Sequence, residues 1–208
     1  MILAIIQARM SSTRLPGKVL MPIAGKPMIK WVIDAALAAK LVDEAVVATS
    51  DRPDDEAIID YVVEYVDVFP GDIDDVLDRF YQAALCHHPA HIVRLTADCP
   101  MSDPAIIDEA VRFHLEGLHD YTRNCKDGFD VEVFTYEALL HAAKLASMPH
   151  QREHVTPYMR EDPCLVKGEL YLPRNKSGKY SVDTEEDFER VEEEMLCLHA
   201  RKNYLRGL

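Results

Sequence analysis

The chain has 208 residues and a formal net charge of −13, with 48% hydrophobic and 28% charged residues. This length permits one sizeable hydrophobic core, and we expect a single domain over residues 1–208. The acidic balance argues against binding to nucleic acid, whose polyanionic backbone rewards extended basic surfaces. No apolar run approaches the ~20 residues that span a bilayer, so we expect no membrane association.

The five cysteines are scattered, and none forms a C-x-x-C pair with another. An odd, scattered set is typical of reduced thiols in the cytosol. The apolar start Met1–Ile6 is too short for the apolar region of a signal peptide, and Arg9 follows it instead of preceding it. We therefore expect a soluble, cytoplasmic protein.

Strand-like and helix-like segments alternate through the first half of the chain. The strands are nearly continuous apolar runs, as in buried parallel strands: Ile2–Gln7, Ala45–Thr49, Val66–Phe69 and His91–Thr96. Each is followed by a helical pattern with a proline or aspartate at its start: Met28–Lys40 after Pro27, a helix from Pro53, one capped by Asp74 or Asp75, and one from Asp103-Pro104 to about Gly117.

The second half is less regular. Strands are predicted at Val131–Phe134, Leu165–Leu172 and Tyr180–Val182, and helices at Tyr136–Ala146, Glu153–Arg160 and Phe188–His199. The alternation of strands and helices predicts an α/β protein with a mainly parallel sheet and helices on both of its faces.

The first acidic residue of this acidic chain is Asp34, and five cations precede it. Three of them lie in Q-A-R-M-S-S-T-R-L-P-G-K, directly after the first predicted strand. Backbone N–H groups, hydroxyls and spaced cations are a common way to hold phosphates. A merely solvated basic turn would not require Pro16, Gly17 and two hydroxyls between the cations. We therefore predict an anion site, although neither a Walker P-loop nor a G-x-G-x-x-G fingerprint is present.

Carboxylates follow four of the other predicted strands at their carboxyl ends, where open parallel sheets bind ligands: Asp51, Asp72, Asp98 and Asp183. A turn or a helix cap accounts for Asp72 and Asp103. For Asp51 and Asp183 a turn and a ligand role both remain open. Asp98 differs, since it lies in D-C-P several residues before the next helix. Carboxylates that face a cationic loop suit a metal–triphosphate, because carboxylates hold Mg²⁺ and cations hold phosphate oxygens.

One further cluster resembles a zinc site but fits it poorly. Cys86, His87, His88 and His91 lie at a helix end and a strand start, without a second Cys or His pair at matching spacing. Histidines at a helix C-terminus also complement the helix dipole. We therefore interpret this cluster as structural.

The motifs together resemble those of the cytidylyltransferases. The similarity covers almost the whole chain in order: I-I-Q-A-R-M-S-S-T-R-L-P-G-K-V-L (5–20), G-K-P-M (25–28), V-V-A-T-S (46–50), D-D-V-L-D-R-F (74–80), V-R-L-T-A-D-C-P (93–100), D-V-E-V-F (130–134), R-E-H-V-T-P-Y (152–158) and S-V-D-T-E-E-D (181–187). It is greatest to the spore coat polysaccharide biosynthesis protein F group. The acylneuraminate and 3-deoxy-manno-octulosonate cytidylyltransferases resemble the chain more distantly.

This resemblance implies a Rossmann-like nucleotidyltransferase (GT-A-like) fold, a three-layer α/β/α sandwich with a mainly parallel sheet. Residues 1–118 would bind the nucleotide, and residues 119–208 would bind the acceptor and form a homodimer. It also implies that CTP and a sugar acid or related acceptor react, with Mg²⁺, to give a CMP-linked product and pyrophosphate for surface glycan biosynthesis.

The resemblance also assigns roles to residues. Arg14, Lys18 and Asp98 would be catalytic, and Asp98 and Asp183 would hold the metal. The nucleotide would contact Gln7, Ala8, Arg9, Ser11, Ser12, Lys18, Thr49, Ser50, Asp51, Gly71, Arg79 and Thr96. The acceptor would contact Glu132, Arg152, Glu153 and His154. An acceptor oxygen would attack the α-phosphorus in line, while Arg14 and Lys18 stabilise the leaving pyrophosphate.

Several alternatives remain at this point. Pro70 stands where this branch usually has arginine before glycine, which leaves the choice between CTP and another NTP open. The acceptor could also be a phosphonate or a phosphorylated metabolite. A non-catalytic nucleotide-binding regulatory module would not need both Asp98 and Asp183. A glycosyltransferase of similar fold should have a D-x-D motif, but Asp98-Cys99-Pro100 lacks the second aspartate.

Overall fold

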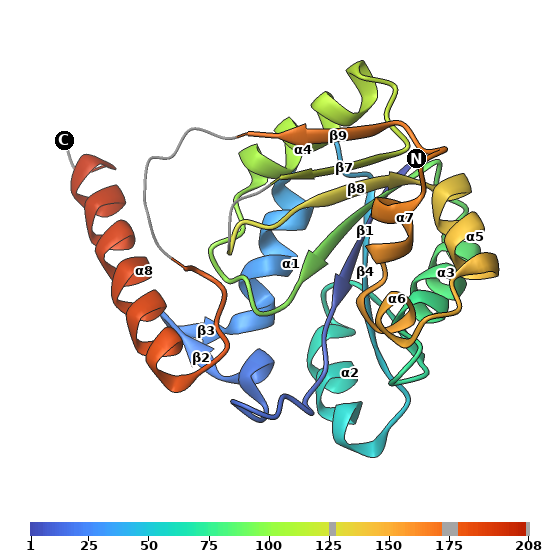
Figure 1. The fold of residues 1–208 in the computed structure, drawn as a ribbon. Coiled ribbons are helices and arrows are strands. Elements are labelled where there is room, and N and C mark those ends of the chain that lie inside the picture. The colour runs from blue at the N-terminus through green and yellow to red at the C-terminus, as the bar shows by residue number, and fades with distance from the viewer. Residues whose placement is uncertain (125–127, 172–178, 207–208) are drawn as a thin grey trace.

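One seven-stranded sheet runs through the molecule in the order β5-β4-β1-β6-β8-β7-β9 (Figure 1). The structure is a computed structural model that describes residues 1–124, 128–171 and 179–206. Its strands are β1 (Ile2–Gln7), β4 (Glu44–Ser50), β5 (Asp67–Gly71), β6 (His91–Thr96), β7 (Tyr121–Asn124), β8 (Glu132–Thr135) and β9 (Lys167–Leu170). Strand β8 is antiparallel to both of its neighbours, and the other pairings in this sheet are parallel. The predicted mainly parallel sheet is confirmed.

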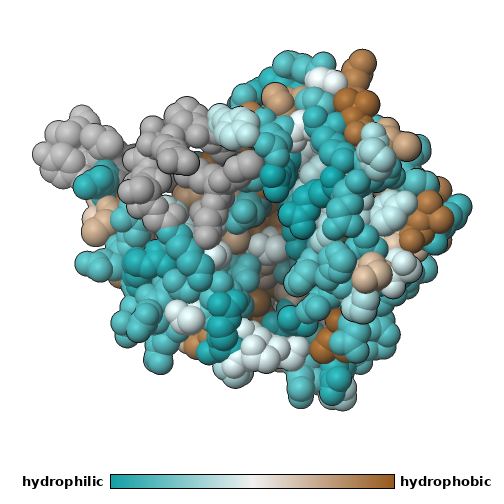
Figure 2. Space-filling model, viewed as in Figure 1, coloured by the Kyte–Doolittle hydropathy of each residue, from teal (hydrophilic) through white to brown (hydrophobic). Residues whose placement is uncertain are grey.

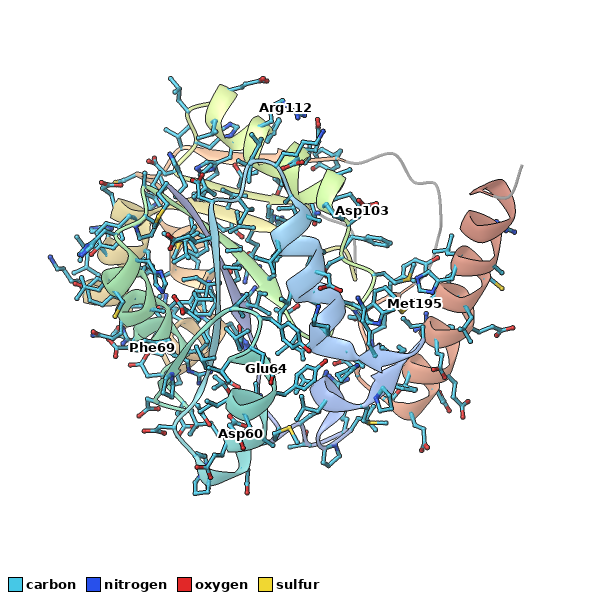
Figure 3. All side chains as sticks on the ribbon, turned by 180° about the vertical axis from the view of Figure 1, so that it is seen from behind. Asp60, Glu64, Phe69, Asp103, Arg112 and Met195 are labelled. Carbon is cyan, nitrogen blue, oxygen red and sulfur yellow. The ribbon has the colours of Figure 1, made fainter. Side chains whose placement is uncertain are left out.

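Helices cover both faces of the sheet. Alternate residues of β1 point to opposite faces, so Ala4 and Ile6 join one core cluster while Leu3 and Ile5 join another. The first cluster contains residues of α1 (Met28–Ala38), α2 (Glu56–Val62) and α4 (Pro104–Glu116), which lie in front of the sheet in Figure 3. The opposite face is covered by α3 (Val76–His87), α5 (Tyr136–Leu145), α6 (Pro149–His154) and α7 (Pro157–Glu161). The three-layer α/β/α arrangement is therefore confirmed.

A smaller unit lies beside the sheet and is built from distant parts of the chain. Strands β2 (Pro22–Ile23) and β3 (Lys26–Pro27) form a hairpin, and helix α8 (Glu185–Arg206) packs against it. Val191 and Met195 of α8 share a core with Ile23 and Met28, and Figure 3 labels Met195 on this helix. None of the helices in the described ranges is long and apolar enough to cross a membrane.

Some predicted elements differ from the structure. The single helix expected over Glu153–Arg160 is two short helices that are separated at Val155. Tyr180–Val182 forms no strand, and the Val182 amide makes one hydrogen bond of 2.9 Å to the Asp98 carbonyl. Strand β7 was not predicted, because Tyr-Thr-Arg-Asn lacks an apolar run. The last residue of the strand predicted at 165–172 lies outside the described residues, as does Cys125.

The aspartates interpreted as turn and cap residues behave as such. The Asp72 carboxylate accepts hydrogen bonds from the amides of Asp74 and Asp75, at 2.7 and 2.9 Å. These amide bonds hold the pKa of Asp72 below its ordinary value. Asp75 caps α3, and Asp103 caps α4 at the position labelled in Figure 3. These aspartates therefore stabilise local structure beside the site.

Candidate active site

A cavity of about 250 Å³ lies at the carboxyl ends of β1 and β6. Its lining comes from the β1 loop, the end of β6 and one residue before α8: Gln7, Ala8, Arg9, Ser12, Thr13, Arg14, Lys18, Val19, Thr96, Ala97, Asp98 and Asp183. The space-filling view is hollowed near its centre, with hydrophilic residues around the hollow (Figure 2). The structure therefore brings the predicted cationic loop and two of the predicted carboxylates to one cavity.

The loop after β1 folds around the carbonyl of Met10. The amides of Ser12 and Gly17 both donate to that oxygen, each at 2.9 Å. Gly17 has a φ of 73°, a left-handed conformation that glycine adopts without steric cost. The turn directs the chain into the short 3₁₀ helix η1 (Lys18–Leu20). The Lys18 side chain consequently lies inside the protein.

Lys18 is the centre of the ionic contacts in this cavity. Its Nζ is 2.8 Å from Asp98 Oδ2 and 3.3 Å from Asp183 Oδ1, and it donates to the Val182 carbonyl at 2.6 Å. Arg14 Nη2 is 2.9 Å from the same Asp183 oxygen. Lys18 as a whole is only 7% exposed. Two carboxylates from distant parts of the chain therefore share one buried ammonium.

The Asp183 carboxyl group is ionised in this arrangement. Burial alone would raise its pKa, but hydrogen bonds and charges from Lys179 and Lys18 outweigh burial and hold the pKa below the ordinary value. Lys179 in turn bonds to both Asp183 and Asp187, at 2.8 Å each. The carboxylate is thus available to a cation at neutral pH.

The paired carboxylates fit a hard divalent cation. Mg²⁺ takes oxygen ligands and commonly uses one or two carboxylates together with substrate phosphates and water. Asp98 and Asp183 supply two such oxygens close enough to contact the same ammonium. The described residues contain no group of three or more His, Cys, Asp or Glu arranged for a metal. Phosphate oxygens and water would therefore complete the coordination shell.

The cluster that resembled a zinc site is structural in the described chain. His87 Nδ1 lies 3.0 Å from Glu44 Oε2, and His91 Nδ1 lies 3.1 Å from His114 Nε2. The free cysteine Cys86 is exposed. His87 and His91 thus each contact a partner outside the cluster, in agreement with the structural interpretation.

A second cavity of about 330 Å³ adjoins the first. It is lined from β6, β7, β8 and the α6–α7 segment: Arg94, Thr96, Arg123, Asn124, Asp130, Glu132, His154, Thr156 and Arg160. Thr96 lines both cavities. Arg94 Nη2 of the second cavity donates to Gln7 Oε1 of the first at 3.0 Å. Two ligands bound side by side would therefore meet at the end of β6.

Glu132 accepts hydrogen bonds from several side chains at the second cavity. It accepts from Arg94 Nη1 at 2.5 Å, from Thr156 Oγ1 at 2.9 Å and from the Tyr121 hydroxyl. Burial would raise the pKa of Glu132, but the charge of Arg94 and these hydrogen bonds hold it below its ordinary value. The same burial and the adjacent carboxylate raise the pKa of Tyr121. Glu132 is thus an ionised carboxylate that fixes the side chains around it.

Several predicted nucleotide contacts lie outside the first cavity lining. Thr49 and Ser50 are buried, while Asp51 and Ser11 are exposed. Arg79 is 1% exposed and donates to the carbonyls of Asp72 and Ile73, so its guanidinium stabilises the loop after β5. A Cβ at Gly71 would lie 3.0 Å from the Arg79 side chain, which explains a glycine there.

Of the predicted acceptor residues, some line the second cavity and others lie outside it. Glu132 and His154 line the second cavity. Glu153 lies 4.0 Å from Arg9, an exposed contact across to the loop after β1. Arg152 instead joins α6 to α3, because it donates to the Asp75 carboxylate and, at 2.8 Å, to a carbonyl of α5. The motif thus contributes both to the cavity and to the scaffold that supports it.

Sequence reasoning missed Asp55, which supports the loop after β1. This carboxylate is 1% exposed and accepts from the Met10 amide at 2.6 Å, the Ser50 amide at 3.1 Å and the Ser50 hydroxyl at 2.5 Å. It therefore joins the loop after β1 to the end of β4. Acidic residues are common at helix starts, so the sequence offered no signal that separates Asp55 from its neighbour Asp54.

The arginines of the second cavity were also missed. Arg123 lies on β7, which was not predicted, and Arg160 follows the unexpected break at Val155. Arg94 was visible in V-R-L-T, two residues before Thr96. Its position on β6, the neighbour of β1, was the one available signal.

The fold and the site define an α/β protein with a cationic loop and paired carboxylates at the carboxyl edge of a parallel sheet, as suits a metal-bound phosphate ligand. A family model described as cytidylyltransferase matches residues 3–206. The chain belongs to the cytidylyltransferase family and is therefore a nucleotidyltransferase.

Individual relatives agree with this assignment. The chain is 36% identical over 202 residues to the spore coat polysaccharide biosynthesis protein SpsF of Bacillus subtilis, covering 91% of this chain and 84% of SpsF. It superposes on a cytidylyltransferase from Leptospira borgpetersenii with a TM-score of 0.86 and 31% identity, covering 92% and 84% of the two chains. A CMP:2-keto-3-deoxy-manno-octonic acid synthetase solved with CTP shares the fold, at a TM-score of 0.73 and 20% identity over 94% and 98% of the two chains.

Proposed function

We propose that this enzyme transfers CMP from CTP to an anionic, hydroxyl-bearing acceptor such as a sugar acid, and releases pyrophosphate. The observation that carries the proposal is the pair of cavities that meet at Thr96. One holds cations and two carboxylates, and the other holds three arginines against two carboxylates. An arginine-lined cavity favours a carboxylate or phosphate group on the acceptor.

The first cavity would hold the triphosphate. Arg9, Arg14 and the hydroxyls of the β1 loop line this cavity and would bind the triphosphate oxygens. Asp98 and Asp183 would hold Mg²⁺, which supplies polarisation of the α-phosphate when it is bound. Lys18 now compensates those carboxylates, and a divalent ion would free its ammonium to bind the phosphates. This supports a role for Lys18 in stabilising the leaving pyrophosphate.

The second cavity would hold the acceptor beside the α-phosphate. An acceptor oxygen forms the new bond to phosphorus as the bond to pyrophosphate breaks, and the acceptor proton passes to water. Arg94, Arg123 and Arg160 would bind the anionic group and so orient the hydroxyl. Positioning and charge stabilisation carry most of such reactions, so the site needs no dedicated side-chain base.

We further propose the biological setting. SpsF is named for spore coat polysaccharide biosynthesis, and the synthetase solved with CTP is named for a sugar acid. By analogy, the product would be an activated sugar made in the cytoplasm for surface glycan biosynthesis. The enzyme would act as a homodimer, formed by residues 119–208. Light scattering coupled to size exclusion tests the dimer directly.

Pyrophosphate release tests the reaction. The enzyme is incubated with Mg²⁺, each of the four NTPs in turn, and a panel of sugar acids, neutral sugars, phosphonates and phosphorylated metabolites. We expect release with CTP and an anionic acceptor, and a CMP-linked product by mass spectrometry. Asp98→Asn serves as the inactive control. Activity confined to another NTP, or equal activity with neutral sugars, would overturn the proposal.

A further inference from the structure

The chain between α6 and α7 has an unusual backbone. Val155 has a φ of 68° and a ψ of −58°, and the Thr156 amide donates to the His154 carbonyl at 2.8 Å. These values describe a γ-turn with positive φ at its centre, the rare and strained form. Among the described non-glycine residues with positive φ, Val155 is the one with a β-branched side chain, for which this conformation is a true outlier.

The next residue is constrained as well. Thr156 has a φ of −95° and a ψ of −11°, and it precedes Pro157. The proline ring clashes with a preceding residue in this helical region, which is therefore disfavoured. Two consecutive residues thus hold unfavourable conformations. Such strain persists only where the surroundings determine the backbone, and it is concentrated at functional sites.

The surroundings of the turn supply that constraint. The Val155 side chain is fully buried in the core cluster beneath α3 and α5. Thr156 Oγ1 donates to Glu132 at 2.9 Å, and the Thr156 carbonyl accepts from the Arg160 amide at 3.0 Å. Packing on one side and the Glu132 hydrogen bond on the other therefore maintain the turn.

The consequence of the turn is where it places its flanking residues. His154 and Thr156 both line the second cavity, while Val155 between them is buried. On a continuous helix, residues two apart do not face the same side. The γ-turn reverses the chain, so both side chains reach one cavity. Glu153, directly before the turn, also lies 4.0 Å from Arg9 of the first cavity.

We propose that the strained turn at Val155 is a positioning device that presents His154 and Thr156 to the acceptor. The inference rests on the proposed function, since it assigns the acceptor to the second cavity. Val155 acts through its neighbours and is a positioning residue, whereas His154 contacts the acceptor as a hydrogen-bonding group. Rigid placement of both groups lowers the entropic cost of orienting the acceptor hydroxyl.

The test compares two losses of buried volume. Val155→Gly removes the side chain and loosens the turn, because glycine has no preference for one narrow conformation. Met159→Val is the matched control, since Met159 is fully buried in the same cluster on α7 but lies outside the turn. Both variants should lower the melting temperature. Only Val155→Gly should raise the acceptor KM, by about tenfold or more, with the CTP KM close to wild type.

A second pair of variants tests the contact between His154 and the acceptor. His154→Ala should raise the acceptor KM, and His154→Gln, which keeps a hydrogen-bonding group, should restore part of the loss. If Val155→Gly and Met159→Val give the same acceptor KM, or if Val155→Gly raises both KM values equally, the positioning role is overturned. If the wild-type enzyme uses no acceptor with CTP, the proposed function itself fails, and that outcome is distinct from the first two.

Discussion

Asp55 offers the sharpest test of how the loop after β1 is held in place. Its carboxylate is 1% exposed and accepts three hydrogen bonds from Met10 and Ser50. In Asp55→Ala, two backbone amides and one hydroxyl lose this acceptor inside the protein. Each buried donor left unsatisfied costs about 1–3 kcal/mol, and water that enters the space would recover part of the loss. We expect the free energy of unfolding to fall by about 4 kcal/mol.

Asp55→Asn separates the hydrogen bonds from the shape of the side chain. Its amide oxygen can still accept from the Met10 amide, but its NH₂ group then faces the Ser50 amide, which is also a donor. We expect a smaller loss of about 2 kcal/mol, from the one unsatisfied contact. The control is Asp54→Ala, because Asp54 is the exposed neighbour on the same 3₁₀ helix. Exposed substitutions of this kind usually change stability by less than about 0.5 kcal/mol.

Urea denaturation and CTP kinetics measure the two consequences. For a chain of about 200 residues, a loss of about 4 kcal/mol corresponds to a melting temperature roughly 10 °C lower. Because Asp55 contacts the loop after β1, the CTP KM of Asp55→Asn should rise more than its acceptor KM. The reasoning is refuted if Asp55→Ala unfolds within about 1 kcal/mol of Asp54→Ala.

Three further outcomes are expected. Asp98→Asn should nearly abolish turnover while CTP without metal still binds in calorimetry; wild-type kcat would remove Asp98 from the metal site. Burial, then the neighbouring histidines, lowers the pKa of His114 from 6.5 to about 4. Since the unfolded chain takes up that proton first, the free energy of unfolding should fall between pH 6.5 and 4, by about 3 kcal/mol. His114→Gln should flatten this urea-denaturation slope, and exposed His150→Gln should not. Arg152→Ala should lower the free energy of unfolding by about 2 kcal/mol, because its hydrogen bond to Asp75 is lost, and should leave the acceptor KM nearly unchanged. Unchanged stability with a raised acceptor KM would instead place Arg152 at the acceptor.

The first half of the fold could be predicted because its signals are local. A buried parallel strand such as Ile2–Gln7 is a continuous apolar run, and prolines and aspartates mark where helices begin. Strand β7 gave no such signal, because its buried residues include Thr122 and Asn124, which are polar. Their burial is possible only with partners supplied by the fold, as in the hydrogen bond from Asn124 to the Phe129 carbonyl at 2.7 Å.

The break at Val155 had a local signal that a helical pattern obscures. Pro157 lacks an N–H and is best tolerated in the first turn of a helix, so a helix that begins there was the better prediction. The strain at Val155 itself could not be predicted. It depends on the core beneath the turn and on the carboxylate of Glu132, which lies more than 20 residues earlier in the chain.

The sequence predicted the cations and the carboxylates of the candidate active site, but it did not predict which cation contacts which carboxylate. The sequence placed Lys18 with the cations that hold phosphate, whereas the structure buries it between Asp98 and Asp183. Both carboxylates contact the one ammonium, which offsets the repulsion between them. Under the proposed function, a divalent ion held by these carboxylates would displace the Lys18 ammonium, which could then bind phosphate oxygens. If so, the nucleotide and the metal would favour the same position of Lys18, and by reciprocity each should strengthen the binding of the other.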